Sequence, residues 1–293
     1  MPDTPASSAS SEYPEYSEDS EYSDYMTGYS ESLITTAVLD VAARATLPFQ
    51  AARADRNFGT AFWYNDLVEV AEDREVIRQY LVTAEPLTRY EIGQFTLRAG
   101  LAEPELPVDE LVMPGFAKKW SRAGDLGVAV MPTVELHLHA ERKGWSWASQ
   151  EVTAGLAAQP EDIAGLGAEP VPAYALGHEV TGDPGHRRPE RPQTLLAGTV
   201  TRTADGTTRW SGPLPEGCAG APVFAGLPHA GGQVKLVCLG LLLPGGPGEA
   251  RGPGDAPGSA GPRDSGTVAT FDKLRPAIHA LTPSPKRHWW QRG

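Results

Sequence analysis

Residues 217–224 read Gly-Cys-Ala-Gly-Ala-Pro-Val-Phe, and the interpretation of the whole chain is organised around this segment. Two glycines three residues apart allow a tight turn that bulkier residues resist. The proline ends the turn, and the apolar residues after it favour a strand. The stretch therefore predicts a glycine turn that leads directly into a buried strand. Ala219, between the two glycines, gives that turn no hydroxyl group.

This stretch resembles the nucleophile loop of chymotrypsin/trypsin-like serine peptidases, Gly-x-Ser-Gly-Gly-Pro, with Ala219 in place of the serine. In that loop the serine hydroxyl attacks the substrate, and two backbone N–H groups stabilise the oxyanion that forms. The resemblance assigns these N–H groups to Gly217 and Ala219. It implies an oxyanion-hole-like backbone without its nucleophile.

Two further motifs resemble the same family, in the order that the family has them. Residues 81–86, Leu-Val-Thr-Ala-Glu-Pro, resemble the stretch Leu-Val-Thr-Ala-Ala-His, whose histidine is the general base. Pro86 holds that position and has no titratable group. Residues 125–132 resemble the stretch that carries the aspartate of the triad, which corresponds to Asp125. The triad-equivalent positions are thus Pro86, Asp125 and Ala219, and with no histidine to orient, Asp125 is expected to cap a turn.

The resemblance spans roughly residues 35–282 and implies an all-β, chymotrypsin-like fold. We expect two six-stranded antiparallel β-barrels, over residues 33–150 and 151–282, with a C-terminal helix. Alternating or continuous apolar runs and turn residues predict the strands, and residues 37–41 fit either a strand or a short helix. The C-terminal helix is expected over residues 272–281, with Asp272 as its N-cap. The strands are expected at residues 58–64, 76–84, 92–99, 172–176, 195–203, 207–210, 234–243 and 266–270.

Composition sets three segments apart from these barrels. Residues 1–32 hold eight acidic residues and no lysine or arginine, so they take eight of the net charge of −12 and leave −4 for the rest. This acidic, Tyr- and Ser-rich segment is expected to be a disordered tail, with a docking role as the alternative. Residues 244–266 contain 13 glycines or prolines and are expected to form a flexible loop. Residues 283–293 form a basic, aromatic tail.

The same composition excludes several classes of function. A net negative charge argues against a nucleic-acid partner, and no apolar run is long enough for a membrane span. With no secretory signal pattern and only two cysteines, the simplest interpretation is a cytoplasmic protein. Glu135, His137 and His139 are expected to share one face of a strand, an arrangement that a polar face explains better than a metal site. We expect no metal and no cofactor.

The remaining histidines and cysteines suggest no second catalytic centre. His178, His186 and His229 are expected on loops without a recognisable partner. Cys218 is the candidate for an alternative nucleophile, since related viral peptidases use cysteine in this loop. However, it lies one residue before the serine position, so we expect its thiol to be buried, and Cys238 is expected in the core.

The sequence therefore predicts a pseudoprotease, a peptidase-like fold that acts by binding a peptide or protein partner. Without triad residues, only about 10³–10⁴-fold acceleration survives, compared with about 10⁶–10¹⁷-fold for complete enzymes. One alternative is an active peptidase that uses Cys218 or another recruited nucleophile. A second alternative is a structural or adaptor protein that makes no use of the cleft.

Overall fold

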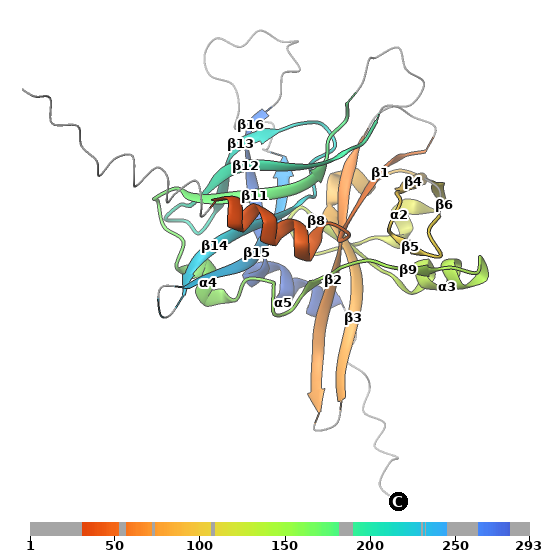
Figure 1. Cartoon of the computed structure of the whole chain (residues 1–293), viewed down its shortest axis with the longest axis horizontal. Helices are drawn as coiled ribbons and strands as arrows, with labels where there is room; N and C mark the ends of the chain where they lie inside the picture. The colour runs from red at the N-terminus through yellow and green to blue at the C-terminus, as the bar shows by residue number, and fades with distance from the viewer. Residues whose placement is uncertain are drawn as a thin grey trace, which may run out of the picture.

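A computed structural model describes residues 31–52, 57–71, 74–106, 109–181, 190–229, 231, 233–244 and 263–281. Residues 31–42 form an N-terminal helix, red in Figure 1. The other elements are β1 (Thr46–Ala51), β2 (Gly59–Ala71), β3 (Arg74–Ala84), η1 (Glu85–Thr88), β4 (Ile92–Leu97), β5 (Ala102–Glu103), β6 (Asp109–Pro114), α2 (Phe116–Lys119), β7 (Ser121–Arg122), β8 (Val128–Pro132), α3 (Val134–Arg142), β9 (Ser146–Trp147), β10 (Val152–Thr153), α4 (Pro160–Ala164), β11 (Val171–His178), β12 (Gln193–Arg202), β13 (Thr208–Leu214), β14 (Pro222–His229), β15 (Gln233–Pro244), β16 (Arg263–Thr270) and α5 (Phe271–Leu281).

The first half of the chain forms a curled sheet of eight strands. Its strand order is β6-β4-β1-β2-β3-β8-β7, and β10 pairs in parallel with β2. Strands β2 and β3 form a long hairpin that extends beyond the rest of this sheet (Figure 1). Among the described residues this sheet is open: β8 pairs on its outer side with β7, which has two residues, and β6 is the other end of the order.

The second half forms a closed antiparallel barrel of six strands, in the order β11-β12-β13-β16-β15-β14. Strands β12 and β13 make the hairpin that the sequence predicts around Gly206, whose φ is +78°. Strand β14 begins at Pro222, directly after the glycine turn, and its first four residues are buried. This topology brings the turn at residues 217–220 to the side of the barrel that faces the first sheet, as its contacts below show.

Three apolar clusters hold these parts together. One fills the first sheet around Trp63, Phe95 and Phe116, and another fills the barrel around Trp210, Val223 and Leu239. The third lies between the two units and includes residues of both, such as Phe62, Val82, Phe224 and Leu241, together with the helix α5. Each strand contributes to these clusters through its inward-facing side chains, because alternate residues of a strand lie on the same face of the sheet.

The N-terminal helix resolves the choice between strand and helix at residues 37–41. Val38 and Ala42, four residues apart, are fully buried in the cluster between the two units. Ile34 of the same helix packs close to Gly226 of the barrel. This spacing places one helical stripe against both units.

The all-β fold class with a C-terminal helix is confirmed, and the second barrel is closed as expected. The first unit is a curled half-barrel that the sheet order leaves open. The C-terminal helix starts at Phe271, so Asp272 lies inside it and accepts a hydrogen bond from the Thr270 hydroxyl. Asp272 is therefore not the N-cap, which corrects the expectation.

The expected strand with Glu135, His137 and His139 is wrong, because these residues lie in α3. The alternation of leucine and histidine there fits a strand, yet Leu136 and Ala140 are the buried residues, at the spacing of one helical turn. The helix starts after Thr133, whose hydroxyl donates to Gln79 of β3. Tertiary packing thus overrides the alternating pattern.

Several predicted features lie wholly or partly outside the described residues. They are residues 1–30 of the acidic tail, residues 245–262 of the Gly/Pro-rich loop, residues 283–293 and His186. The described ends of these segments are regular: residues 31–32 are helical, and residues 263–266 belong to β16. Within the described residues, no helix is long and apolar enough to cross a membrane.

Candidate functional site

The turn at residues 217–220 requires glycine at both ends. Gly217 has a φ of +93° and Gly220 has a φ of +89°, which side-chain-bearing residues rarely adopt. A Cβ atom on Gly217 would lie 2.3 Å from the carbonyl oxygen of His178. A Cβ atom on Gly220 would lie 2.2 Å from the carbonyl oxygen of Thr60. The turn is therefore pressed against both β11 and β2.

Thr60 of β2 fastens this turn to the first sheet. Its backbone N–H donates to the carbonyl oxygen of Ala219 at 2.9 Å, and its hydroxyl donates to the carbonyl oxygen of Gly217 at 2.8 Å. The same hydroxyl accepts the backbone N–H of His178 at 3.0 Å. Thr60 is fully buried, so these bonds form away from water. One side chain thus fixes the position of the turn relative to both sheets.

The position that the resemblance assigns to the base lies on η1, directly after β3. Pro86 is exposed there, whereas the preceding Glu85 is 5 % exposed. The Glu85 carboxylate accepts two hydrogen bonds from Arg89, at 2.9 and 2.5 Å, and lies 2.9 Å from Nε of Arg122. The Arg89 hydrogen bond outweighs the effect of burial and lowers the pKa of Glu85, so the carboxylate is charged at neutral pH. The residue beside Pro86 is an ion-paired anion and therefore a weak base.

Main-chain contacts bring the three segments of the expected triad together. The N–H of Glu85 donates to the carbonyl oxygen of Gly127 at 2.8 Å, which joins the Pro86 segment to the Asp125 segment. A Cβ atom on Gly220 would lie 3.1 Å from the backbone nitrogen of Ala84, so the turn also abuts this segment. Asp125 itself is exposed, in the connection between β7 and β8.

His178 is fully buried at the end of β11, which corrects the expectation of a loop histidine without a partner. Its Nδ1 lies 3.3 Å from the carbonyl oxygen of Arg191, and its Nε2 lies 3.0 Å from the Thr46 hydroxyl. Since a carbonyl only accepts, Nδ1 carries the proton, and Nε2 accepts from Thr46, whose oxygen accepts from Gln193 at 2.7 Å. Burial and the charges of Arg98 and Arg191 lower the pKa of His178 to about 3. The imidazole is therefore neutral.

Arg191 is a second residue at the junction of the two units, and no sequence pattern pointed to it. Its guanidinium donates to the carbonyl oxygens of Phe49 at 3.2 Å and Gly59 at 2.8 Å. It also lies 5.1 Å from the centre of the Phe58 ring. Burial lowers the pKa of Arg191 to about 10. The side chain therefore joins the barrel to β1 and β2 as a cation at neutral pH.

Both cysteines are buried and unpaired. The Cys218 sulfur would lie 2.8 Å from a Cβ atom on Gly177, so its side chain turns into the barrel core. Burial raises the pKa of the Cys218 thiol to about 12 and also raises the pKa of Cys238. A thiol needs to ionise to act as a nucleophile, so this environment disfavours Cys218 in that role.

The residues considered for a metal site all lie on α3, and each of them contacts a residue outside that helix. Glu135 forms an ion pair with Lys119 of α2, and His137 lies 2.6 Å from the side-chain oxygen of Gln79. The His139 ring packs edge-on against Trp145. The described part of the chain contains no group of three or more His, Cys, Asp or Glu side chains that could hold a metal ion.

Comparisons with known sequences identify no relative. No protein-family model matches the chain, and no curated protein matches it.

Solved structures with a similar fold include three proteases or protease paralogues. A thermostable serine protease AL20 from an extremophilic microorganism is 11% identical, with a TM-score of 0.40, covering 82% of this chain and 97% of that one. A scabies mite inactivated protease paralogue, S-D1, is 10% identical, with a TM-score of 0.39, covering 82% and 90%. The protease Anisep from Arthrobacter nicotinovorans is 10% identical, with a TM-score of 0.38, covering 78% and 89%. At this level of likeness they carry no argument about this chain, whose fold rests on its own strand order.

Proposed function

We propose that this protein is a catalytically inactive homologue of chymotrypsin/trypsin-like serine peptidases, which acts by binding a peptide or protein partner. The observation that carries the proposal is the combination of a retained turn and absent reactive groups. Thr60 and the two glycines hold the turn at residues 217–220 in a defined position, yet Ala219 and Pro86 supply neither nucleophile nor base.

The surroundings of Pro86 support the absence of general base catalysis. A useful base has a pKa near the working pH and lies within about 2.6–3.2 Å of the proton it takes. The buried Glu85 carboxylate has a lowered pKa and is already bonded to Arg89 and Arg122. His178, near the turn, has a pKa of about 3 and bonds through both ring nitrogens. Neither group is suited to activate a nucleophile.

The turn suggests the chemistry of the ligand. Backbone N–H groups that converge in a glycine turn attract a carbonyl oxygen or a carboxylate. The ligand is therefore a peptide, bound at its C-terminus or through a main-chain carbonyl, near Gly217 and Ala219. A nucleic-acid ligand is disfavoured by the net charge of −12. The two unpaired cysteines suit a cytoplasmic location.

The alternatives differ from this proposal in what they require of the turn. An active peptidase would need Cys218 as its nucleophile, although this thiol is buried with a raised pKa. An adaptor that makes no use of the turn would bind its partner elsewhere. The described fold gives Cys218 no path to a substrate without a rearrangement of the core around it.

The test uses the full chain and a library of short peptides with free C-termini. Binding is measured by fluorescence anisotropy and hydrolysis by mass spectrometry of the same samples. Ala219→Phe should abolish peptide binding because it fills the turn, whereas Ala197→Phe, at an exposed position of β12, should leave binding unchanged. No peptide should be cleaved.

Two other outcomes would overturn the proposal. Cleavage that disappears in Cys218→Ala would establish a cysteine peptidase. Peptide binding that persists in Ala219→Phe would place the binding surface away from the turn and favour the adaptor.

A further inference from the structure

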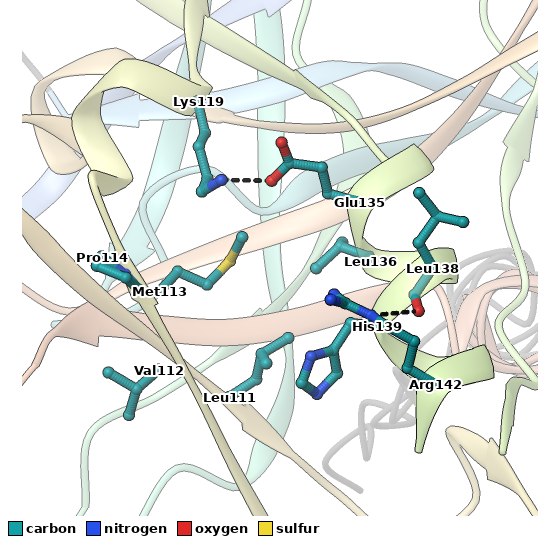
Figure 2. Close-up of a pocket in the computed structure, with 10 residues that line it drawn as sticks. All are labelled: Leu111, Val112, Met113, Pro114, Lys119, Glu135, Leu136, Leu138, His139 and Arg142. Carbon is teal, nitrogen blue, oxygen red and sulfur yellow. Dashed lines mark hydrogen bonds and ion pairs between the residues drawn. The ribbon is translucent and has the colours of Figure 1, made fainter. Parts of the chain in front are cut away.

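A groove follows the outer edge of β6, the strand at one end of the first sheet. A cavity of about 510 Å³ separates β6 from α3, with Leu111 and Met113 facing Leu136 and His139 across it (Figure 2). A cavity of about 530 Å³ towards α2 shares Met113 and Leu136 with it. A smaller one of about 210 Å³, towards Trp145, shares Leu111 and His139. The three cavities share these lining residues, and together we call them the β6 groove.

The backbone of β6 turns hydrogen-bonding groups towards the outer edge of the first sheet. The carbonyl oxygen of Ile92 accepts from Ala52, so Ile92 faces β1, and Gln94, two residues on, also faces β1. Val112 lies opposite Gln94 and therefore forms a non-hydrogen-bonded pair with it. Its N–H and C=O point away from β4. No strand of the described residues pairs with this edge, so the edge is a template for an added strand.

The groove also leaves apolar side chains uncovered. Val112 of β6 is 51% exposed and Leu138 of α3 is 50% exposed, and both line the cavity. The floor beneath them, formed by Leu111, Met113 and Leu136, is apolar and buried. Exposed apolar side chains grouped along a hollow with a free strand edge are typical of a binding surface.

The charge of the groove is opposite to that of the whole chain. Four basic and two acidic side chains line it, while the chain as a whole carries −12. Glu135 is paired with Lys119, so this pair cancels and leaves three basic side chains and one acidic side chain along the groove. The basic residues are Lys118, Lys119, Arg142 and Lys143. This charge complements an acidic ligand and opposes a basic one.

We propose that the β6 groove binds an extended acidic segment of another protein, which pairs with β6 as an added strand. Alternate side chains of that segment face the groove, and a bulky apolar one lies between Met113 and Leu136. The basic side chains along the groove attract the acidic residues of the segment. This function goes beyond the peptide site proposed above, because no groove residue belongs to the turn at residues 217–220 or to residues 84–86 and 125–127.

The test measures binding of a fluorescent peptide of alternating glutamate and tyrosine, eight residues long, to the full chain. Leu138→Glu should weaken binding about tenfold or more, since it places a charge on the apolar wall. Ile77→Glu is the matched control, because Ile77 is 52% exposed on β3 and lines none of these cavities; it should change the affinity less than twofold. Binding should weaken as salt is added.

Two peptide controls decide the mode of binding. The same peptide with N-methyl groups on alternate residues cannot complete the strand pairing and should not bind. A peptide of alternating lysine and tyrosine should not bind either. Equal binding of either control overturns the proposal, as does the absence of binding by the first peptide.

The oligomeric state tests for another occupant. Suppose that sedimentation shows dimers of the full chain that dissociate in Leu138→Glu but not in Ile77→Glu. In that case the groove binds a second copy of this chain instead. That result would also overturn the proposal. Failure here would leave the peptide site at Gly217 and Ala219 unaffected, because Leu138→Glu alters only the groove.

Discussion

The Thr60 hydroxyl joins Gly217 of the turn to His178 of β11, an arrangement that we call the Thr60 clamp. The clamp can be tested by removing this hydroxyl in Thr60→Val, which keeps the shape of the side chain. The hydroxyl donates to Gly217 and accepts from His178, both through buried main-chain groups. The substitution leaves a carbonyl and an N–H group unsatisfied away from water. Each such group costs about 1–3 kcal/mol, so the free energy of unfolding should fall by about 2–6 kcal/mol.

Thr208→Val is the matched control because the Thr208 side chain is equally inaccessible, at 2% exposure, and its hydroxyl has no partner among the described residues. The same substitution there should leave stability unchanged or raise it. Urea unfolding of the wild type and both variants, followed by circular dichroism, gives the three free energies. Equal free energies for Thr60→Val and Thr208→Val would refute the clamp.

Three further predictions test the surroundings of the turn. Gly220→Ala should lower the melting temperature far more than Gly100→Ala, because only the first places a Cβ against Thr60, whereas both have a positive φ. Cys218 should resist a thiol reagent at pH 8 until the protein unfolds, and rapid labelling would contradict its burial. The pKa of Glu85 is lowered by folding, so its ion pairs stabilise the protein above the unfolded pKa and lose this effect as pH falls through the folded pKa. The stability gap between wild type and Glu85→Gln should therefore be full at pH 7 and close below about pH 4; a gap that grows on acidification would contradict the assignment.

Several strands were predictable because each carries its own signal, whereas β1, β6 and the two-residue strands were not expected. The hairpin of β12 and β13 follows from a glycine turn between two apolar runs, and β14 from the proline after the turn. The helix α3 was missed because a run of alternating leucine and histidine satisfies both periods, and only the burial of Leu136 and Ala140 distinguishes them. The first sheet is open next to β7, which pairs with β8 through two residues only. No local sequence pattern specifies that this strand is so short.

The candidate site was only partly predictable for a related reason. The glycine turn and the missing hydroxyl of Ala219 are visible in the sequence itself. The clamp joins Thr60 to Gly217 across 157 positions, and His178 meets Thr46 across 132. Such pairs are set by the packing of the two units, and an isolated threonine or histidine gives no sign of them.

The proposed function requires that the glycine turn at residues 217–220 carries no reactive group. The most direct test is the intact mass of the full chain after incubation with a fluorophosphonate, which phosphonylates activated serine hydroxyls. We predict an unchanged mass for the wild type, and also for Ala219→Ser, whose new hydroxyl would have Pro86 in place of a base. A stoichiometric adduct on the wild type would show an activated nucleophile and contradict the account.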